Sequence, residues 1–303
     1  MFELIKNLTQ EQLVIIVSTP IYAFFIGAEI ILSNWQHRGF YTIKDTFTNV
    51  YLMLLNMAID FFSRGVTWGI LAWIFQYRFL EIQTPWIYWL TLFILEDFLY
   101  YVLHVVDHYS RFFWASHVTH HSSEQFNLTV GFRSSVFQPL YRFIYFIPLS
   151  LFGFKATDIA LVYAVTQIYG ILVHTSYIPK FRSPILKALE YVFVSPSHHR
   201  VHHASNVEYL DKNMGMCLIV WDRLFGTYQE EKDEISIKYG LVSELEDRGP
   251  VNIVFHEWVK IAKDLKKPVD MITKLKYVFM PPGWSHDGSS KTSNQLREEL
   301  KIK

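Results

Sequence analysis

Cysteine is almost missing from this chain of 303 residues, which contains only Cys217. A single thiol excludes a disulfide within the chain and an iron–sulfur centre held by four thiolates. The chain also lacks an excess of either charge, since 28 Lys and Arg balance 28 Asp and Glu. Phosphate binding needs a basic excess, so nucleic acid is not expected as a partner.

Charge is sparse in the first two thirds of the chain. Residues 1–210 hold 26 charged side chains, whereas the shorter segment 211–303 holds 30, and 51% of all residues are hydrophobic. Pro20 and Glu29 interrupt the first apolar stretch, so we expect it to be retained as a membrane helix and not cleaved as a signal peptide. The first part is therefore lipid-compatible and the rest is polar.

About 20 predominantly apolar residues are needed to cross a bilayer. Residues 13–32 and 85–102 meet this need, and 47–76 is expected to be a span plus a shorter interfacial or re-entrant piece, broken at Asp60, Arg64 and Gly65. Residues 143–154 and 159–178 are expected to form a helical hairpin. The predicted fold is an all-α integral membrane bundle of about four spans plus re-entrant or interfacial helices, with a histidine-rich di-metal cap.

A modest excess of basic residues in the connections that carry the histidines places this cap in the cytoplasm, by the positive-inside tendency. The expected organisation has three parts: N-terminal membrane helices in 1–90, a catalytic region in 91–230, and a polar C-terminal tail packed on the cap in 231–303.

Ten of the 13 histidines lie between His104 and His203. Nine of them follow a pattern of one HxxxH, two HxxHH and one single residue: His104, His108, His117, His120, His121, His174, His199, His202 and His203. Residues three and four apart share one face of a helix, so three short helices should each present a histidine face. Ser195 and Pro196 are suited to begin the last of them.

So many imidazoles are enough for two metal ions and too many for one. A histidine-rich site at a membrane interface, without a hydrolytic nucleophile nearby, favours oxygen activation by two irons over zinc hydrolysis, although zinc is the ion that overexpression could introduce. A bis-histidine haem is the competing metal interpretation, but two axial ligands do not call for HxxHH triplets.

Two carboxylates, Glu96 and Asp97, lie inside an apolar run just before His104. Asp97, seven residues before His104, is expected to accept a proton from a ligand imidazole, and pairing with Arg133 or Arg142 is the structural alternative.

Several stretches resemble the fatty acid hydroxylase/sterol desaturase superfamily of membrane di-iron oxidases, and most of all its alkylglycerol monooxygenase branch with its bacterial relatives. They are Asp97-Phe-Leu-Tyr-Tyr, His117-Val-Thr-His-His-Ser-Ser-Glu-Gln-Phe-Asn127, Ser195-Pro-Ser-His-His-Arg-Val-His-His203, Asp211-Lys-Asn-Met-Gly215, Trp221-Asp-Arg-Leu-Phe-Gly-Thr-Tyr228 and Pro281-Pro-Gly-Trp284.

The resemblance implies that all nine patterned histidines are metal ligands, with His198 beside them in a supporting position. It implies hydroxylation of an unactivated lipid carbon with O2, including cleavage of the ether bond of alkylglycerol-type lipids. A fatty acyl or sterol hydroxylase or desaturase is the alternative within the superfamily. No flavin fingerprint or haem module is present, so a separate electron donor is expected.

Three interpretations from other classes are a metal transporter, a haem-type electron carrier and an inactive lipid-binding scaffold. A transporter should place histidines along several spans at mid-membrane depth, whereas here they lie at span ends or in polar loops. A scaffold has no need of nine converging ligands.

Overall fold

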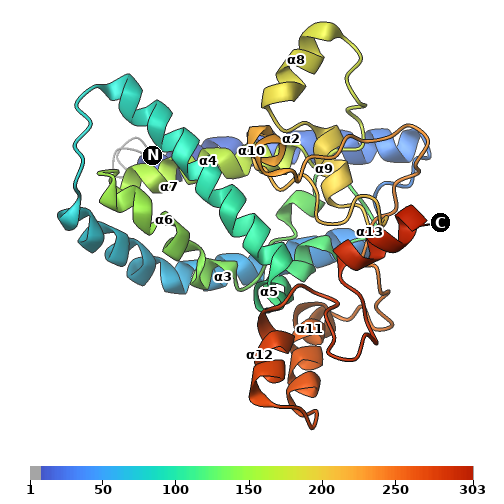
Figure 1. Ribbon diagram of the computed structural model, residues 1–303. Coiled ribbons are helices and arrows are strands. Elements are labelled where there is room, and N and C mark those ends of the chain that lie inside the picture. The colour runs from blue at the N-terminus through green and yellow to red at the C-terminus, as the bar shows by residue number, and fades with distance from the viewer. Residues whose placement is uncertain (1–7, 303) are drawn as a thin grey trace.

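The computed structural model describes residues 8–302, and these fold into helices and loops with two isolated β-bridges, Phe193–Leu218 and Ala204–Tyr239 (Figure 1). The all-α prediction is therefore confirmed for this part of the chain. The α-helices are α2 (Gln10–Trp35), α3 (Ile43–Ile74), α4 (Pro85–Tyr109), α5 (Arg111–His121), α6 (Arg142–Leu151), α7 (Ala156–Leu172), α8 (Pro184–Val192), α9 (Pro196–His202), α10 (Val220–Phe225), α11 (Pro250–Leu265), α12 (Met271–Phe279) and α13 (Ser293–Ile302). Short 3₁₀ turns are η1 (Phe75–Tyr77), η2 (Val130–Phe132) and η3 (Gln138–Leu140).

Two helices of residues 8–302 are long and apolar enough to cross a membrane. They are α2, with a mean hydropathy of 2.0, and α4, with 1.5. Large apolar side chains face outward on α2, α3 and α4, for example Phe24 at 69% exposed, Phe62 at 82% and Trp86 at 68%. Such outward apolar faces fit a hydrocarbon surrounding. The total of about four spans stays a prediction.

Helix α3 is continuous where the sequence predicted a break. Asp60 and Arg64 lie one turn apart inside it and form an ion pair with an N–O distance of 2.7 Å. Arg142 from α6 binds the other oxygen of Asp60 at 3.0 Å, and Glu11 from α2 binds Arg64 at 2.8 Å. Because the charges are paired between helices, the helix does not have to unwind to solvate them.

Helices α6 and α7 form the expected hairpin, with the turn at residues 152–155. Gly153 has a φ of +91°, and a Cβ there would lie 2.3 Å from the Leu80 carbonyl oxygen, so the turn requires glycine. The hairpin packs on α3 and α4 around Leu71, Leu92 and Phe146, which are at most 1% exposed. This core holds α3, α4, α6 and α7 together.

The segment predicted as a polar tail contains α11, α12 and α13. Helices α11 and α12 pack against α5, and Figure 1 shows them at the opposite side of the bundle from α8. The domain boundaries at 90 and 230 and the cytoplasmic orientation stay predictions.

Arg133 is a buried cation that ties α3 to the end of α5. It is 2% exposed. Its guanidinium donates to Asp45 Oδ1 at 3.1 Å and to Asn49 Oδ1 at 2.8 Å, both on α3. It also donates to the Thr119 carbonyl at 2.9 Å, so the α5 histidines are anchored to α3 through this side chain.

We expect Asp45→Ala to lower the free energy of unfolding by about 3 kcal/mol, because it leaves the Arg133 charge buried without its carboxylate partner. Thermal unfolding in detergent, followed by circular dichroism, measures the effect. Lys44→Ala, at the exposed neighbouring position, is the control and should unfold like the parent. Equal unfolding temperatures for the two variants would contradict the prediction.

Candidate metal centre

Three helix ends bring the histidine boxes together. His104 and His108 lie on the last two turns of α4, and α5 carries the first HxxHH. The second HxxHH lies on α9, where the Ser195 side chain accepts the His198 backbone N–H and Pro196 occupies the first turn, as the sequence predicted. His174 follows the end of α7.

The nine patterned histidines form two groups. One contains five rings, His104, His108, His117, His121 and His202, and the other contains four, His120, His174, His199 and His203. Within each group, one nitrogen from every ring lies within 4.8 Å of the others. Eight of the nine are buried and His120 is partly exposed.

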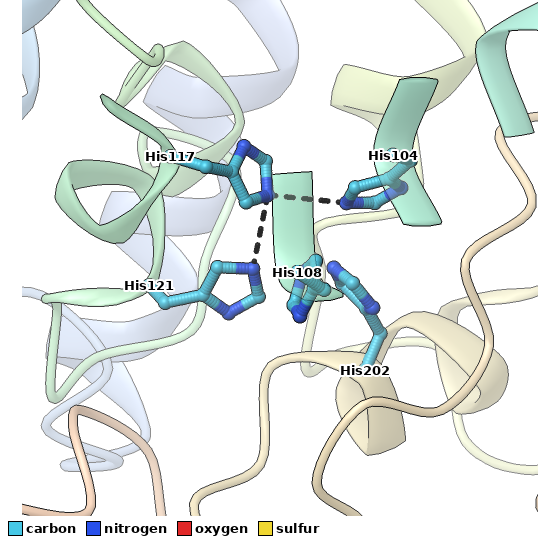
Figure 2. Close-up of side chains that lie close together, drawn as sticks. All are labelled: His104, His108, His117, His121 and His202. Carbon is cyan, nitrogen blue, oxygen red and sulfur yellow. Dashed lines mark hydrogen bonds between the residues drawn. The ribbon is translucent and has the colours of Figure 1, made fainter. Parts of the chain in front are cut away.

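In the five-histidine group, rings from α4, α5 and α9 point at a common centre (Figure 2). His117 Nε2 lies 3.1 Å from His104 Nε2 and 3.2 Å from His121 Nε2. The Nε2 atoms of His108 and His202 are buried, and neither has a hydrogen-bond partner among the described residues. Buried polar atoms are seldom left unpaired, so these two atoms indicate a ligand.

In the four-histidine group the ring nitrogens lie equally close together. His174 Nε2 lies 2.9 Å from His199 Nε2 and 3.1 Å from His203 Nε2. The two groups are neighbours, because the rings of His121 and His203 stack with centroids 4.5 Å apart. Each HxxHH box serves both groups, a division that the sequence did not predict.

Backbone carbonyls fix the orientation of four rings. The Nδ1 atoms of these histidines lie 2.7 to 3.0 Å from the carbonyl oxygens of other residues: His104 with Met214, His120 with Arg133, His174 with Gly170, and His202 with Lys212. A carbonyl only accepts, so Nδ1 carries the proton and Nε2 keeps its lone pair. The lone pairs therefore face the centre of each group.

Two carboxylates that were not predicted as site residues also contact rings of the five-histidine group. Asp211 Oδ1 lies 3.1 Å from His108 Nδ1, and Asp107 Oδ2 lies 3.7 Å from His117 Nδ1, which pairs with the Ser135 hydroxyl at 2.8 Å. The sequence did point to both residues, because Asp107 lies inside the HxxxH box and Asp211 is the first residue of the Asp-Lys-Asn-Met-Gly motif.

One loop, residues 211–214, orients three of the five rings of the first group, through Asp211 and the carbonyls of Lys212 and Met214. Asp211 and Asn213 have φ of 53° and 56°, a left-handed conformation that Asp and Asn tolerate better than most residues. Asp222 holds the far end of the loop by accepting the Met214 and Gly215 N–H groups at 2.7 and 2.8 Å.

Asp97 does not contact a ligand imidazole, so that prediction was wrong, and it pairs with neither Arg133 nor Arg142. Its carboxylate accepts the backbone N–H groups of Cys217 and Leu218 at 2.8 and 3.2 Å and the Trp221 indole N–H at 2.9 Å. Asp97 therefore anchors the segment that follows the 211–214 loop. His198 lies outside both groups, and its Nδ1 accepts the Ser195 N–H.

Burial favours the neutral form of the rings on α5 and α9. Burial lowers the pKa of His117, His121 and His202 well below the ordinary value, and lowers that of His120 to about 4. Neutral imidazole is the form that binds metal. Within each group one nitrogen of every ring lies close to the others, as donors around a single cation do, so the residues fit one metal ion in each group.

A cavity of about 580 Å³ reaches this centre. Its lining includes His108, His121 and His202, together with Trp114, and continues along α11, α12 and residues 282–296. This volume is in the range of small-molecule sites.

Comparison with known proteins gives a match of residues 89–227 to the family model described as fatty acid hydroxylase. Alkylglycerol monooxygenase of Xenopus tropicalis is 32% identical over 284 residues, covering 92% of this chain and 61% of that protein. The Homo sapiens alkylglycerol monooxygenase is 32% identical over 292 residues, covering 93% and 62%. Ornithine lipid hydroxylase OlsE of Rhizobium tropici is 26% identical over 153 residues, covering 50% and 45%. No solved structure matches the chain.

The chain thus spans about three fifths of the length of the two alkylglycerol monooxygenases. The segment that matches the family model contains all nine histidines of the two groups, and also Asp97, Asp211 and Asp222. The similarity to the fatty acid hydroxylase family model therefore lies over residues 89–227, the segment that carries the two histidine groups.

Proposed function

We propose that this chain is a membrane-bound di-iron oxygenase that hydroxylates a C–H bond of a lipid, using O2 and electrons from a separate donor. The observation that carries the proposal is the pair of adjacent groups of five and four histidines, in which one nitrogen of every ring lies within 4.8 Å of the others of its group. We propose all nine histidines as metal ligands, and the eight that belong to the three boxes, all but His174, as the catalytic residues.

Donor spacing supports iron over zinc. Metal–nitrogen bonds of about 2.1 Å separate neighbouring donors by about 3.0 Å at a right angle and about 3.4 Å at a tetrahedral angle. Three of the four Nε2–Nε2 distances, 3.1, 2.9 and 3.1 Å, are closer to the right angle of five- or six-coordinate ions, and the fourth, 3.2 Å, lies midway. Five donors also exceed the four of a tetrahedral zinc site.

Two bound irons would supply the activation of O2. The balanced reaction joins R–H, O2, two electrons and two protons to give R–OH and water. On the carbon next to an ether oxygen, the product is a hemiacetal, which breaks down to an aldehyde and a free alcohol. The protein's own task is to orient the rings through their Nδ1 partners and to keep bulk water out, since the eight buried rings are at most 6% exposed.

The relatives support the choice of substrate. Two of them are named for alkylglycerols and one for a lipid hydroxylase, so we propose an ether lipid of the alkylglycerol type. A fatty acyl or sterol hydroxylase or desaturase of the same family is the second candidate, because the shared histidine boxes do not distinguish the lipid.

The proposed setting is a multi-pass membrane protein with the metal centre on the cytoplasmic face. Helices α2 and α4 support membrane insertion. Because α4 carries His104 and His108 on its last turns, it also supports a centre at the end of the proposed span. The electron donor is proposed to be a separate molecule.

We expect cells that express the chain to convert an added 1-O-alkylglycerol into aldehyde and glycerol under ¹⁸O2, with the label in the aldehyde oxygen. Rapid reduction to the alcohol before mass spectrometry limits exchange with water. His120→Ala should abolish the product, whereas His37→Asn, at an exposed position outside both groups, should not. Label in a hydroxylated acyl chain or sterol instead would favour the second candidate.

Asp211→Asn should weaken metal binding by the five-histidine group about tenfold, because it removes the charge that supports the His108 ring while keeping a side chain that tolerates the left-handed backbone. The iron content that each variant retains at increasing chelator concentrations measures this. Asp233→Asn, at an exposed position, is the control. Retention equal to that of the control would show that Asp211 does not support the site.

A further inference from the structure

Helices α11 and α12 form a hairpin with an apolar outer face. Exposed apolar side chains recur every fourth residue on each helix, with Ile272 beside Met271 as one addition, so each helix carries one apolar stripe. On α11 they are Val251 at 66% exposed, Phe255 at 45% and Val259 at 48%, and on α12 they are Met271 at 69%, Ile272 at 68%, Leu275 at 51% and Phe279 at 55%. An exposed stripe of this size needs a covering surface.

Lysines border the stripe. Residues 258–280 contain six lysines against two aspartates. Neither aspartate is free to pair with the remaining lysines: Asp264 forms ion pairs with Arg111 and Lys267, and the Asp270 side chain caps the start of α12. Four lysines of the hairpin have no acidic partner within residues 8–302: Lys263, Lys266, Lys274 and Lys276. The hairpin therefore presents apolar side chains flanked by unpaired positive charge.

The hairpin is fixed where the α4 span ends. Arg111, two residues after α4, donates its backbone N–H to the Met280 carbonyl at 3.1 Å. Its buried guanidinium binds Glu257 at 2.7 Å and Asp264 at 2.6 Å. These contacts place both helices at the depth at which α4 leaves the hydrocarbon.

Aromatic contacts connect the stripe to the apolar exterior of the bundle. Phe112 packs on Phe279 with ring centroids 6.0 Å apart, and Phe255 packs on Phe137 at 5.8 Å. Beyond Phe137, Leu140 and Ile144 are 52% and 54% exposed. The apolar surface thus continues from the hairpin to the bundle.

From these observations we infer that α11 and α12 lie in the bilayer interface, with the apolar stripe against acyl chains and the four unpaired lysines on anionic lipid headgroups. An amphipathic helix whose stripe is flanked by lysines binds such a surface by burial and charge together. The inference rests on the proposed membrane span α4. The same helices line the cavity that reaches the histidines, so this placement holds the cavity against the surface that supplies lipids.

A site-specific fluorophore tests the placement, because the only cysteine, Cys217, is buried at 3% exposed. Bimane is attached at Ile272→Cys in the stripe, at Leu90→Cys on the exposed face of α4, and at Asp233→Cys in an exposed polar loop. The full chain is reconstituted in nanodiscs with brominated acyl chains, with and without about a third phosphatidylglycerol. We expect quenching at 90 and 272, none at 233, and stronger quenching at 272 with the anionic lipid.

A variant with Lys263, Lys266, Lys274 and Lys276 all changed to Gln should lose the anionic-lipid dependence at 272 while quenching at 90 is unchanged. Quenching at 90 but not at 272 would overturn the inference, as would a blue-shifted but unquenched probe at 272, which would show that protein covers the stripe. Equal quenching in both lipids would overturn the role of charge. No quenching at 90 would instead overturn the proposed membrane span.

Discussion

The structure depends on bringing nine imidazoles together, eight of them buried, with one nitrogen of each ring close to the others of its group. Such an arrangement is unfavourable for the protein alone, because burial removes water, and nitrogens 2.9 to 3.2 Å apart repel wherever both carry a lone pair. Two features make it possible. Hydrogen bonds at Nδ1 fix the direction of most rings and the tautomer of the four that face a carbonyl, and a cation in each proposed site would satisfy the Nε2 atoms.

Much of the remaining fold supports those Nδ1 partners. The 211–214 loop serves three rings, and it is held by Asp222 and, one step further on, by Asp97 from inside α4. Arg133 plays the equivalent part for the second group, since its carbonyl faces His120 while its guanidinium ties α5 to α3. Buried charges in this bundle therefore act as positioning residues, and the amphipathic hairpin α11–α12 braces α5 from outside.

The sequence was sufficient to predict the helical fold and the nine histidines that come together, because box spacing and helical periodicity are local. It did not predict how the boxes divide, since His120 and His121 are adjacent in sequence but belong to different groups. The predicted break in α3 is absent, because Asp60 and Arg64 find ion-pair partners on other helices. Asp97 was misassigned for the same reason, since its partners are 120 or more residues away. Contacts of this kind are set by helix packing, which no local pattern encodes.

The central claim is that the two groups are two separate iron sites. Metal analysis of protein purified without oxygen tests it most directly, comparing the parent with His121→Ala from the five-histidine group and His174→Ala from the four-histidine group. The account predicts about two irons per chain in the parent and about one in each variant. One iron or none in a folded parent, or loss of both ions together in each folded variant, would contradict it.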